Sequence, residues 1–239
     1  MTTLFISDLH LDDERPFITE LFEQFLRGEA REAQALYILG DLFESWIGDD
    51  DDASLAQRVQ DALAELSRSG VATYFMAGNR DFLVGPRFAQ RSGVTLLDDP
   101  ARIDLAGVPT LLMHGDTLCT DDAAYQAFRR QVREPAWQAE FLAKPLAERR
   151  EMARQLRAQS EREKAAKEMA IMDVNPEAVA AALREHGYPR LIHGHTHRPA
   201  WHNHEVDGRV CERWVLPDWY EGGGYLCCNA EGCNAFSLA

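Results

Sequence analysis

The stretch Leu4-Phe5-Ile6-Ser7-Asp8-Leu9-His10 joins a short apolar run to an Asp-x-His pair, and a comparable arrangement returns four times along the chain. Each apolar run is typical of a strand that is buried on both faces. Side chains at i and i+2 of an extended backbone leave on the same side, so Asp8 and His10 can face one site. The five runs are residues 4–6, 35–39, 72–76, 110–113 and 191–192.

Residue types that bind metal ions follow every one of these runs directly. In an open α/β sheet, the carboxyl ends of the strands meet in one crevice, so we expect side chains that are distant in sequence to converge there. Glycine precedes three of them and follows a fourth, which permits tight turns and close approach of the backbone. The set consists of Asp8, His10, Asp41, Asn79, His114, His195 and His197.

Seven donors are too many for one ion. Carboxylate, amide and imidazole donors without thiolate suit Mn²⁺, Fe²⁺ or Zn²⁺, and one Asp can bridge two ions about 3.5 to 4 Å apart. Asp41 is the candidate bridge. A single Asp-x-His or His-x-His pair is more often ordinary polar surface or core, but five such segments in order favour a two-metal site.

Amphipathic helices are expected between the apolar runs, and this alternation predicts an α/β layered fold. Pro16 suits the first turn of one helix, and Asn175 can cap another that Pro176 begins. The chain from residue 201 onward has β-like runs around Asp207-Gly208 and Glu231-Gly232, which predict antiparallel hairpins at the end of the sheet.

Residues 121–170 break the alternation with a nearly uninterrupted helical stretch, which we interpret as a cap inserted into a single domain that spans residues 1–239. Pro135 and Pro145 are expected to separate its helices. The stretch holds 11 of the 25 Lys and Arg residues against 9 Asp and Glu, although the chain as a whole carries a formal net charge of −14. A confined anionic ligand or membrane surface is one interpretation, and a solvated helix face is the other.

Charge and composition exclude several classes of protein. A net charge of −14 repels a phosphate backbone, so nucleic acid is not an expected partner. We expect no signal peptide and no membrane span, because there is neither a basic N-terminal region nor a run of 18 apolar residues. Five cysteines, an odd number, predict reduced thiols in the cytosol. A zinc site at Cys227, Cys228 and Cys233 is the alternative, although separated Cys-x-x-Cys pairs are lacking.

Taken in order, the motifs Asp-x-His, Gly-Asp, Gly-Asn-x-Asp, His and Gly-His-x-His resemble those of the calcineurin-like metallophosphoesterase superfamily. The resemblance extends along nearly the whole chain and implies a two-sheet α/β sandwich that carries the helical cap. The superfamily usually has His where this chain has Arg80, and that His is thought to protonate an alkoxide leaving group. Arg cannot do so at neutral pH, but it can hold a phosphate through a bidentate contact. We therefore hypothesise that the leaving group needs no proton, as in diphosphate cleavage.

Longer motifs at 78–83, 114–122, 170–175 and 193–199 resemble the UDP-2,3-diacylglucosamine pyrophosphohydrolase family over roughly residues 1–200. The resemblance implies two Mn²⁺ ions per chain and metal-activated water that attacks the α-phosphorus, releasing UMP and 2,3-diacylglucosamine 1-phosphate (lipid X). It also implies a role in lipid A synthesis at the cytoplasmic side of the inner membrane. The contact with the membrane surface is expected to be peripheral, and no obligate protein partner is inferred.

The resemblance also carries roles onto matching positions of this chain. It places one metal on Asp8, His10, Asp41 and His197, and the other on Asp41, Asn79, His114 and His195. It gives the catalytic residues as Asp41, Asn79, Arg80 and His195. The substrate contacts that it implies are Asn79, Arg80, Asp122, Ser160, Lys164, Lys167 and His195. Some members have Asn at the position of Lys164, although Ser160, Lys164 and Lys167 share one helix face.

Apolar residues of the cap can line a groove for acyl chains, or they can simply dock its helices. They are Tyr125, Phe128, Val132, Trp137, Phe141, Leu142, Leu146, Met152 and Leu156. Of the remaining charged residues, 49–52 are expected to form a solvated loop that caps the helix after Ala53. Arg157 is interpreted as an exposed helix charge rather than a phosphate contact.

Two other functions stay open at this point. One is a phosphodiesterase or nucleotide pyrophosphatase that uses the same metals on a soluble substrate, and a cap that binds no lipid favours it. The other is a metallophosphoesterase-like scaffold that binds protein partners and has lost catalysis. Low metal content after purification in the presence of Mn²⁺ favours that scaffold.

Overall fold

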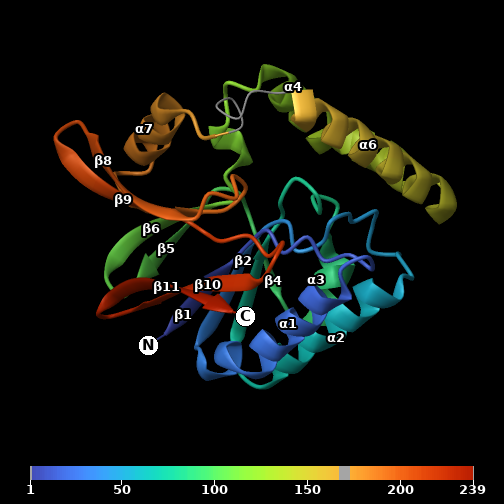
Figure 1. Ribbon diagram of the computed structural model, residues 1–239, viewed down its shortest axis with the longest axis horizontal. Helices are drawn as coiled ribbons and strands as arrows, with labels where there is room; N and C mark the ends of the chain where they lie inside the picture. Colours follow the sequence, from blue (N-terminus) through green and yellow to red (C-terminus); the bar gives the residue numbers. More distant parts are fainter. Residues whose placement is uncertain (1, 167–172, 239) are drawn as a thin grey trace.

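Two mixed β-sheets pack face to face in the computed structural model, which describes residues 2–166 and 173–238 (Figure 1). The first sheet has the order β11-β10-β1-β2-β3-β4, and the second has the order β5-β6-β7-β9-β8. The strands of the first sheet are β1 (Thr3–Ile6), β2 (Ala35–Leu39), β3 (Ala72–Met76), β4 (Thr95–Leu97), β10 (Gly223–Asn229) and β11 (Gly232–Leu238). Those of the second are β5 (Ala101–Leu105), β6 (Val108–Met113), β7 (Arg190–His193), β8 (Ala200–Val206) and β9 (Arg209–Val215).

Helices cover the outer face of each sheet, and a separate group forms the cap (Figure 1). Against the first sheet pack α1 (Pro16–Arg27), α2 (Ser54–Arg68) and α3 (Pro86–Ser92). Against the second packs α7 (Pro176–Glu185). The cap consists of α4 (Ala123–Arg133), α5 (Pro135–Leu142) and α6 (Leu146–Ala166). The described residues also form two short 3₁₀ helices, η1 (Glu29–Glu32) and η2 (Asp116–Leu118).

The alternation of side chains along β1 shows why the apolar runs are continuous. Leu4 and Ile6 join the cluster beneath the helices, whereas Phe5 joins the cluster between the two sheets. Because both faces of each central strand are buried, no position calls for a polar residue. The five predicted strands and the two-sheet α/β sandwich are therefore confirmed.

The local signals for helix ends also hold. Helix α1 begins at Pro16, and Asn175 caps α7 by accepting the backbone N–H groups of Glu177 and Ala178. The β8–β9 hairpin turns at Asp207-Gly208 as predicted, whereas the β10–β11 turn lies at residues 230–231, one position earlier than expected.

The sequence prediction for residues 49–52 was wrong. Ala53, not an Asp, stands at the N-cap of α2, and it receives no side-chain cap. Asp49 instead accepts the backbone N–H groups of Gly85, Arg87 and Phe88 at the start of α3. Residues 50–52 pair with arginines of α6, so this loop fastens the cap to the core.

The prediction that all cysteines are reduced was also wrong. Cys228 and Cys233 stand directly opposite each other on β10 and β11 and form a disulfide. Cys119, Cys211 and Cys227 keep thiol side chains. Within residues 2–166 and 173–238, no helix combines the length and apolar character needed to cross a bilayer.

Candidate metal centre

The predicted ligands leave the carboxyl ends of parallel strands in both sheets, at the edge where the sheets meet. Strands β1, β2 and β3 run parallel in one sheet, and β6 and β7 run parallel in the other. Two contacts join the edges of the two sheets: His195 N–H donates to Asp8 Oδ2 at 2.8 Å, and His114 Nδ1 lies 2.9 Å from the Leu39 carbonyl. The strand-end loops of both sheets therefore surround one site.

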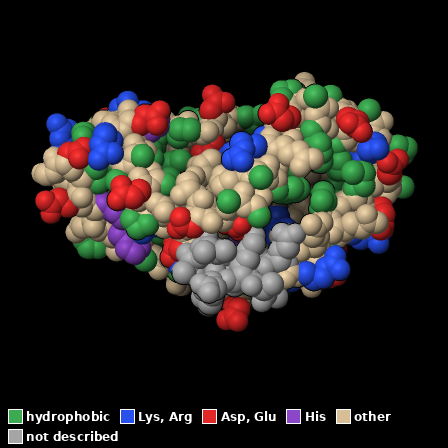
Figure 2. All heavy atoms as spheres, turned by 90° about the horizontal axis from the view of Figure 1, so that it is seen from above, with side chains coloured by type: hydrophobic (Ala, Val, Ile, Leu, Met, Phe, Trp, Pro, Cys, Tyr) green, Lys and Arg blue, Asp and Glu red, His purple; other side chains and the backbone are tan. Residues whose placement is uncertain are grey.

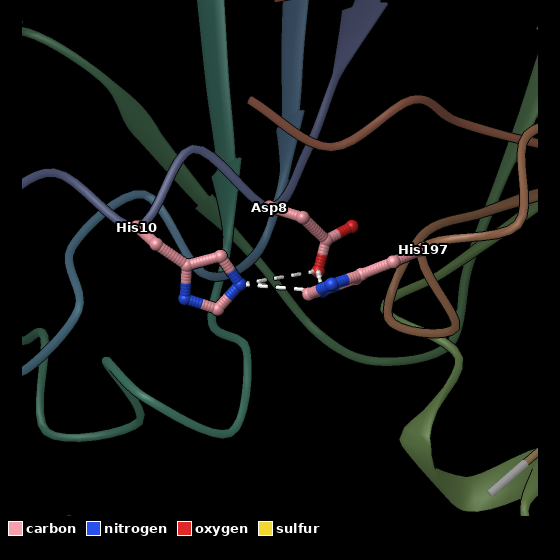
Figure 3. A group of neighbouring side chains, drawn as sticks. All are labelled: Asp8, His10 and His197. Atoms are coloured by element: carbon pink, nitrogen blue, oxygen red, sulfur yellow. Dashed lines mark hydrogen bonds and ion pairs between the residues drawn. The ribbon is translucent and has the colours of Figure 1, made fainter. Parts of the chain in front are cut away.

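Asp8, His10 and His197 form the first group of candidate ligands (Figure 3). The Nε2 atoms of the two histidines lie 3.3 Å apart, and Asp8 Oδ1 lies 3.4 Å from His197 Nε2 and 3.9 Å from His10 Nε2. Asp8 and His10 are buried, and His197 is partly exposed toward the cavity. Three donor atoms thus face one point from two sheets.

Asp41 connects this group to a second one. Its Oδ2 lies 3.7 Å from His10 Nε2, while its Oδ1 lies 3.8 Å from His114 Nε2. The amide oxygen of Asn79 lies 3.0 Å from His114 Nε2 and 2.9 Å from His195 Nδ1. All seven predicted ligands are therefore together, with one carboxylate turned toward both groups.

The donor set fits divalent cations. Asp8 Oδ2 is occupied by Ser7 Oγ and by the His195 N–H, but the buried Oδ1 has no hydrogen-bond partner among the described residues. A buried carboxylate oxygen of this kind is costly unless a cation faces it. Moreover, the ring nitrogen of His114 that points away from the cluster lies 2.9 Å from the Leu39 carbonyl, which fixes the ring as metal ligands require.

Five of the candidate metal ligands lie on strained backbone, and this strain sets the direction of their side chains. Asp8, His10, Asp41, His195 and His197 have positive φ angles between 49° and 68°, a region that non-glycine residues rarely adopt. Close packing adds to this constraint. A β-carbon on Gly78 would lie 2.2 Å from Asp41 Oδ1, and one on Gly194 would lie 2.2 Å from Asp8 Oδ2. These two glycines are therefore required by contact with the candidate ligands.

Carboxylates around His114 determine the pKa of its imidazole. Burial opposes the charged imidazole, but Asp41, Asp116 and Asp8 outweigh it and raise the pKa of His114 to about 9. Burial and the neighbouring His114 lower the pKa of His195 to about 4. In the metal-free protein at pH 7, His114 therefore carries a proton while His195 is neutral.

Metal binding is expected to release a proton, because a protonated His114 cannot be a ligand. One competing proton weakens apparent affinity by about tenfold per pH unit below a pKa of about 9, and the dependence levels off above it. Titration calorimetry with Mn²⁺ at pH 7, in buffers of different ionisation enthalpy, measures the protons released. Binding without proton release at pH 7 would contradict this assignment.

Three polar residues that sequence reasoning left without a role support the ligands. Asp81 is fully buried and accepts the backbone N–H groups of Gly78 and Leu42, each at 2.8 Å, which shapes the loops that carry Asn79 and Asp41. Asp116 accepts Tyr125 Oη–H at 2.6 Å, and the Tyr125 ring stacks 5.9 Å from that of His195. Glu44 lies behind His10.

A signal for these supports was visible in the sequence. Asp81 and Asp116 lie inside the motifs at residues 78–83 and 114–122, which follow β3 and β6. Glu44 is the one carboxylate within residues 42–47, which are otherwise Leu, Phe, Ser, Trp and Ile. A charged residue within a buried apolar segment requires a partner, and this alone marks Glu44 for attention.

A cavity of about 970 Å³ extends from the cluster of candidate metal ligands into the cap. His10, Asp41, Asn79, Arg80 and His195 line its polar end. Figure 2 looks onto the cap side of the molecule, where hydrophobic side chains lie among both basic and acidic ones. Seven of the nine apolar cap residues named from the sequence line the cavity: Tyr125, Phe128, Val132, Trp137, Phe141, Met152 and Leu156.

The predicted substrate contacts differ in how the structure places them. Arg80, Asp122 and Ser160 line the same cavity as the cluster. The side chain of Lys164 and the whole of Lys167 lie outside the described residues. Arg157 is not merely an exposed helix charge: it lines the cavity and lies 3.1 Å from Asp12 Oδ2 and 3.3 Å from Glu44 Oε1.

Comparison with known proteins agrees with this geometry. The family model for calcineurin-like phosphoesterases matches residues 1–199. A protein of Aromatoleum aromaticum named UDP-2,3-diacylglucosamine hydrolase is 58% identical over 226 residues, covering 95% of this chain and 92% of its own length. A Xanthomonas axonopodis pv. citri protein of the same name is 55% identical, with both chains fully covered. The chain therefore belongs to the calcineurin-like phosphoesterase family and is a hydrolase.

Proposed function

We propose that this protein hydrolyses the diphosphate of UDP-2,3-diacylglucosamine to UMP and 2,3-diacylglucosamine 1-phosphate (lipid X), by attack of water on the α-phosphorus. The main support for this proposal is one continuous cavity, which has candidate metal ligands at one end and apolar residues of the cap at the other. Such a cavity suits a substrate that has a diphosphate and acyl chains in one molecule. The name shared by full-length relatives at 54–58% identity supports the same substrate.

Two Mn²⁺ ions per chain are the proposed cofactors. Asp8, His10, Asp41 and His197 would hold one ion, and Asp41, Asn79, His114 and His195 would hold the other. Ions bound there lower the pKa of water and offset negative charge that develops on phosphoryl oxygens. This donor set also accepts Fe²⁺ or Zn²⁺, so metal-dependent activity of the stripped protein decides among them.

The side chains of the chain itself position the substrate. The Asn79 amide oxygen lies between the rings of His114 and His195 and holds both in place. The Arg80 backbone N–H donates to Asp41 Oδ1 at 2.8 Å, so the position of Arg80 is fixed to that of the candidate bridging residue. The Arg80 guanidinium lines the polar end of the cavity, where it can hold a phosphate group.

Arg80→His is expected to shift the preference of the enzyme among leaving groups. A histidine can protonate an alkoxide, whereas Arg cannot, and a departing phosphate needs no proton. We expect hydrolysis of alkyl or aryl phosphodiesters to rise relative to diphosphates by about tenfold or more, since general acid catalysis contributes at least this much. The ratio of kcat/KM values for the two substrate classes measures the effect, and an unchanged ratio would refute the leaving-group argument.

We also propose peripheral attachment at the cytoplasmic side of the inner membrane, because the substrate is a lipid. Two large apolar side chains of the cap, Phe128 and Leu142, are each 40% exposed. Apolar side chains at a membrane surface bind together with basic residues when the lipid is anionic. Cosedimentation with vesicles that contain or lack phosphatidylglycerol tests this attachment. If the protein binds neither kind of vesicle, the proposal is refuted.

The function itself is tested by comparing UDP-2,3-diacylglucosamine with UDP-N-acetylglucosamine in the presence of Mn²⁺. We expect UMP and lipid X from the first substrate and at least a hundredfold lower kcat/KM for the second, because binding energy from remote acyl chains contributes to positioning. Equal rates on both substrates would favour a pyrophosphatase for soluble nucleotides. Absence of turnover of either, with low metal content, would favour a non-catalytic scaffold.

A further inference from the structure

Glu44 is a buried carboxylate that contacts His10, one of the candidate metal ligands. It follows β2 by five residues, its backbone N–H donates to the Leu11 carbonyl at 3.1 Å, and only 4% of it is exposed. Its neighbours Phe43 and Trp46 belong to the apolar core. Burying a charge in such surroundings is costly unless partners compensate, so its contacts account for its presence.

The two oxygens of Glu44 have different partners. Oε2 lies 3.0 Å from His10 Nδ1, the ring nitrogen opposite the one that faces Asp8, Asp41 and His197. Oε1 lies 3.3 Å from Arg157 Nε and 3.6 Å from Arg80 Nε. One carboxylate thus lies between an imidazole and two guanidinium groups.

Each partner comes from a different part of the fold. His10 follows β1, Arg80 follows β3, and Arg157 belongs to the cap helix α6. A carboxylate beside Nδ1 favours the proton on that nitrogen, and hence the tautomer whose Nε2 lone pair is available to a metal. The other oxygen holds two guanidinium groups that line the cavity. One side chain thus touches the metal cluster, a loop of the core and the cap.

We propose that Glu44 is a positioning residue with two separable roles. Through Oε2 it orients His10 toward the metal, and through Oε1 it orients Arg80 and Arg157 toward the substrate and ties the cap to the metal centre. The second role rests on the proposed function. The first does not, because it concerns metal binding alone.

Two substitutions separate the roles. Glu44→Gln keeps the size of the side chain and an oxygen that can accept from His10, but its amide N–H₂ cannot hold the arginines. Glu44→Met fills the same apolar surroundings and removes both interactions. Glu65→Gln is the matched control, since it removes one carboxylate on α2, where the Glu65 side chain is 55% exposed. Thermal melting establishes that each variant is folded.

The experiment measures Mn²⁺ affinity of the metal-stripped proteins by electron paramagnetic resonance, and then KM and kcat on UDP-2,3-diacylglucosamine. For Glu44→Met we expect Mn²⁺ affinity to fall about 10- to 100-fold, the usual effect of losing the partner of a metal-binding histidine. For Glu44→Gln we expect Mn²⁺ affinity within about threefold of the wild type and KM raised about tenfold, with little change in kcat, as for loss of ion pairs that align binding groups.

The outcomes decide each role independently. Wild-type Mn²⁺ affinity in folded Glu44→Met would overturn the role at His10. Wild-type KM in Glu44→Gln would overturn the role at the arginines, as would an equal effect of Glu65→Gln. If the wild-type protein does not cleave UDP-2,3-diacylglucosamine, the proposed function and the second role fall together, while the Mn²⁺ titration still decides the first.

Discussion

Asp41→Ala is expected to lower kcat by about a thousandfold or more and to reduce the metal content from the proposed two ions per chain to one or none. The reason is that Oδ2 of Asp41 faces His10 while Oδ1 faces His114, so the two candidate metal positions share this carboxylate. Its removal weakens both positions and also frees the Arg80 backbone N–H, which donates to Oδ1. Elemental analysis after gel filtration gives the metal content, and product release gives kcat.

Asp61→Asn is the matched control, because its side chain is 69% exposed on α2, where it pairs with Arg91. We expect this control to keep the metal content of the wild-type protein. Full activity of Asp41→Ala, or two ions per chain in that variant, would show that Asp41 is not the bridge.

Arg149→Met is expected to impair hydrolysis of the lipid substrate while leaving a small phosphodiester largely unaffected. Arg149 is 2% exposed and fastens α6 to the core: Nη1 donates to the Ile47 carbonyl at 2.7 Å and to Asp50 Oδ1 at 2.8 Å. Its Nε donates to the Lys144 carbonyl at 3.0 Å. Misplacement of a binding surface can lower the rate about a hundredfold, so we expect that loss in kcat/KM for UDP-2,3-diacylglucosamine.

The comparison that checks this prediction is between two substrates and two variants. A soluble diester such as bis-p-nitrophenyl phosphate contacts the metal centre without needing the apolar cap. Arg154→Met is the control, since the Arg154 side chain is 75% exposed and pairs with Glu151 of the same helix, where an ion pair contributes little to stability. Equal losses on both substrates would mean that Arg149 supports the metal centre rather than the position of the cap.

Much of the fold follows from residues 4–10 and their four counterparts. Strands that are buried on both faces, followed at once by polar residues, predict both the sheet and the edge at which ligands meet. The separation into two sheets came from the family resemblance, because an apolar run such as residues 110–113 does not specify which strands it pairs with. Strands β4 and β5 were missed, since Thr95–Leu97 is short and Ala101–Leu105 contains Arg and Asp.

The remaining misses have a common physical cause, which is that their partners lie far away in sequence. Asp49 reads as a cap for the helix that follows it, yet it caps α3 some 36 to 39 residues later. Glu44 pairs with Arg157 of the cap, a partner that lies far from it in the sequence. Cys228 finds Cys233 only once the hairpin register is known. Local propensity identifies the elements, whereas tertiary contacts select the partners of these polar groups and thiols.

We propose that this site uses water to cleave the diphosphate of a nucleotide-linked lipid at its α-phosphorus. The most direct measurement is hydrolysis of UDP-2,3-diacylglucosamine by Mn²⁺-loaded protein in ¹⁸O-labelled water, with mass spectrometry of both products. We predict one labelled oxygen in UMP and none in 2,3-diacylglucosamine 1-phosphate. Label in the lipid product would contradict the attacked phosphorus, and no cleavage alongside turnover of simple diesters would contradict the lipid substrate.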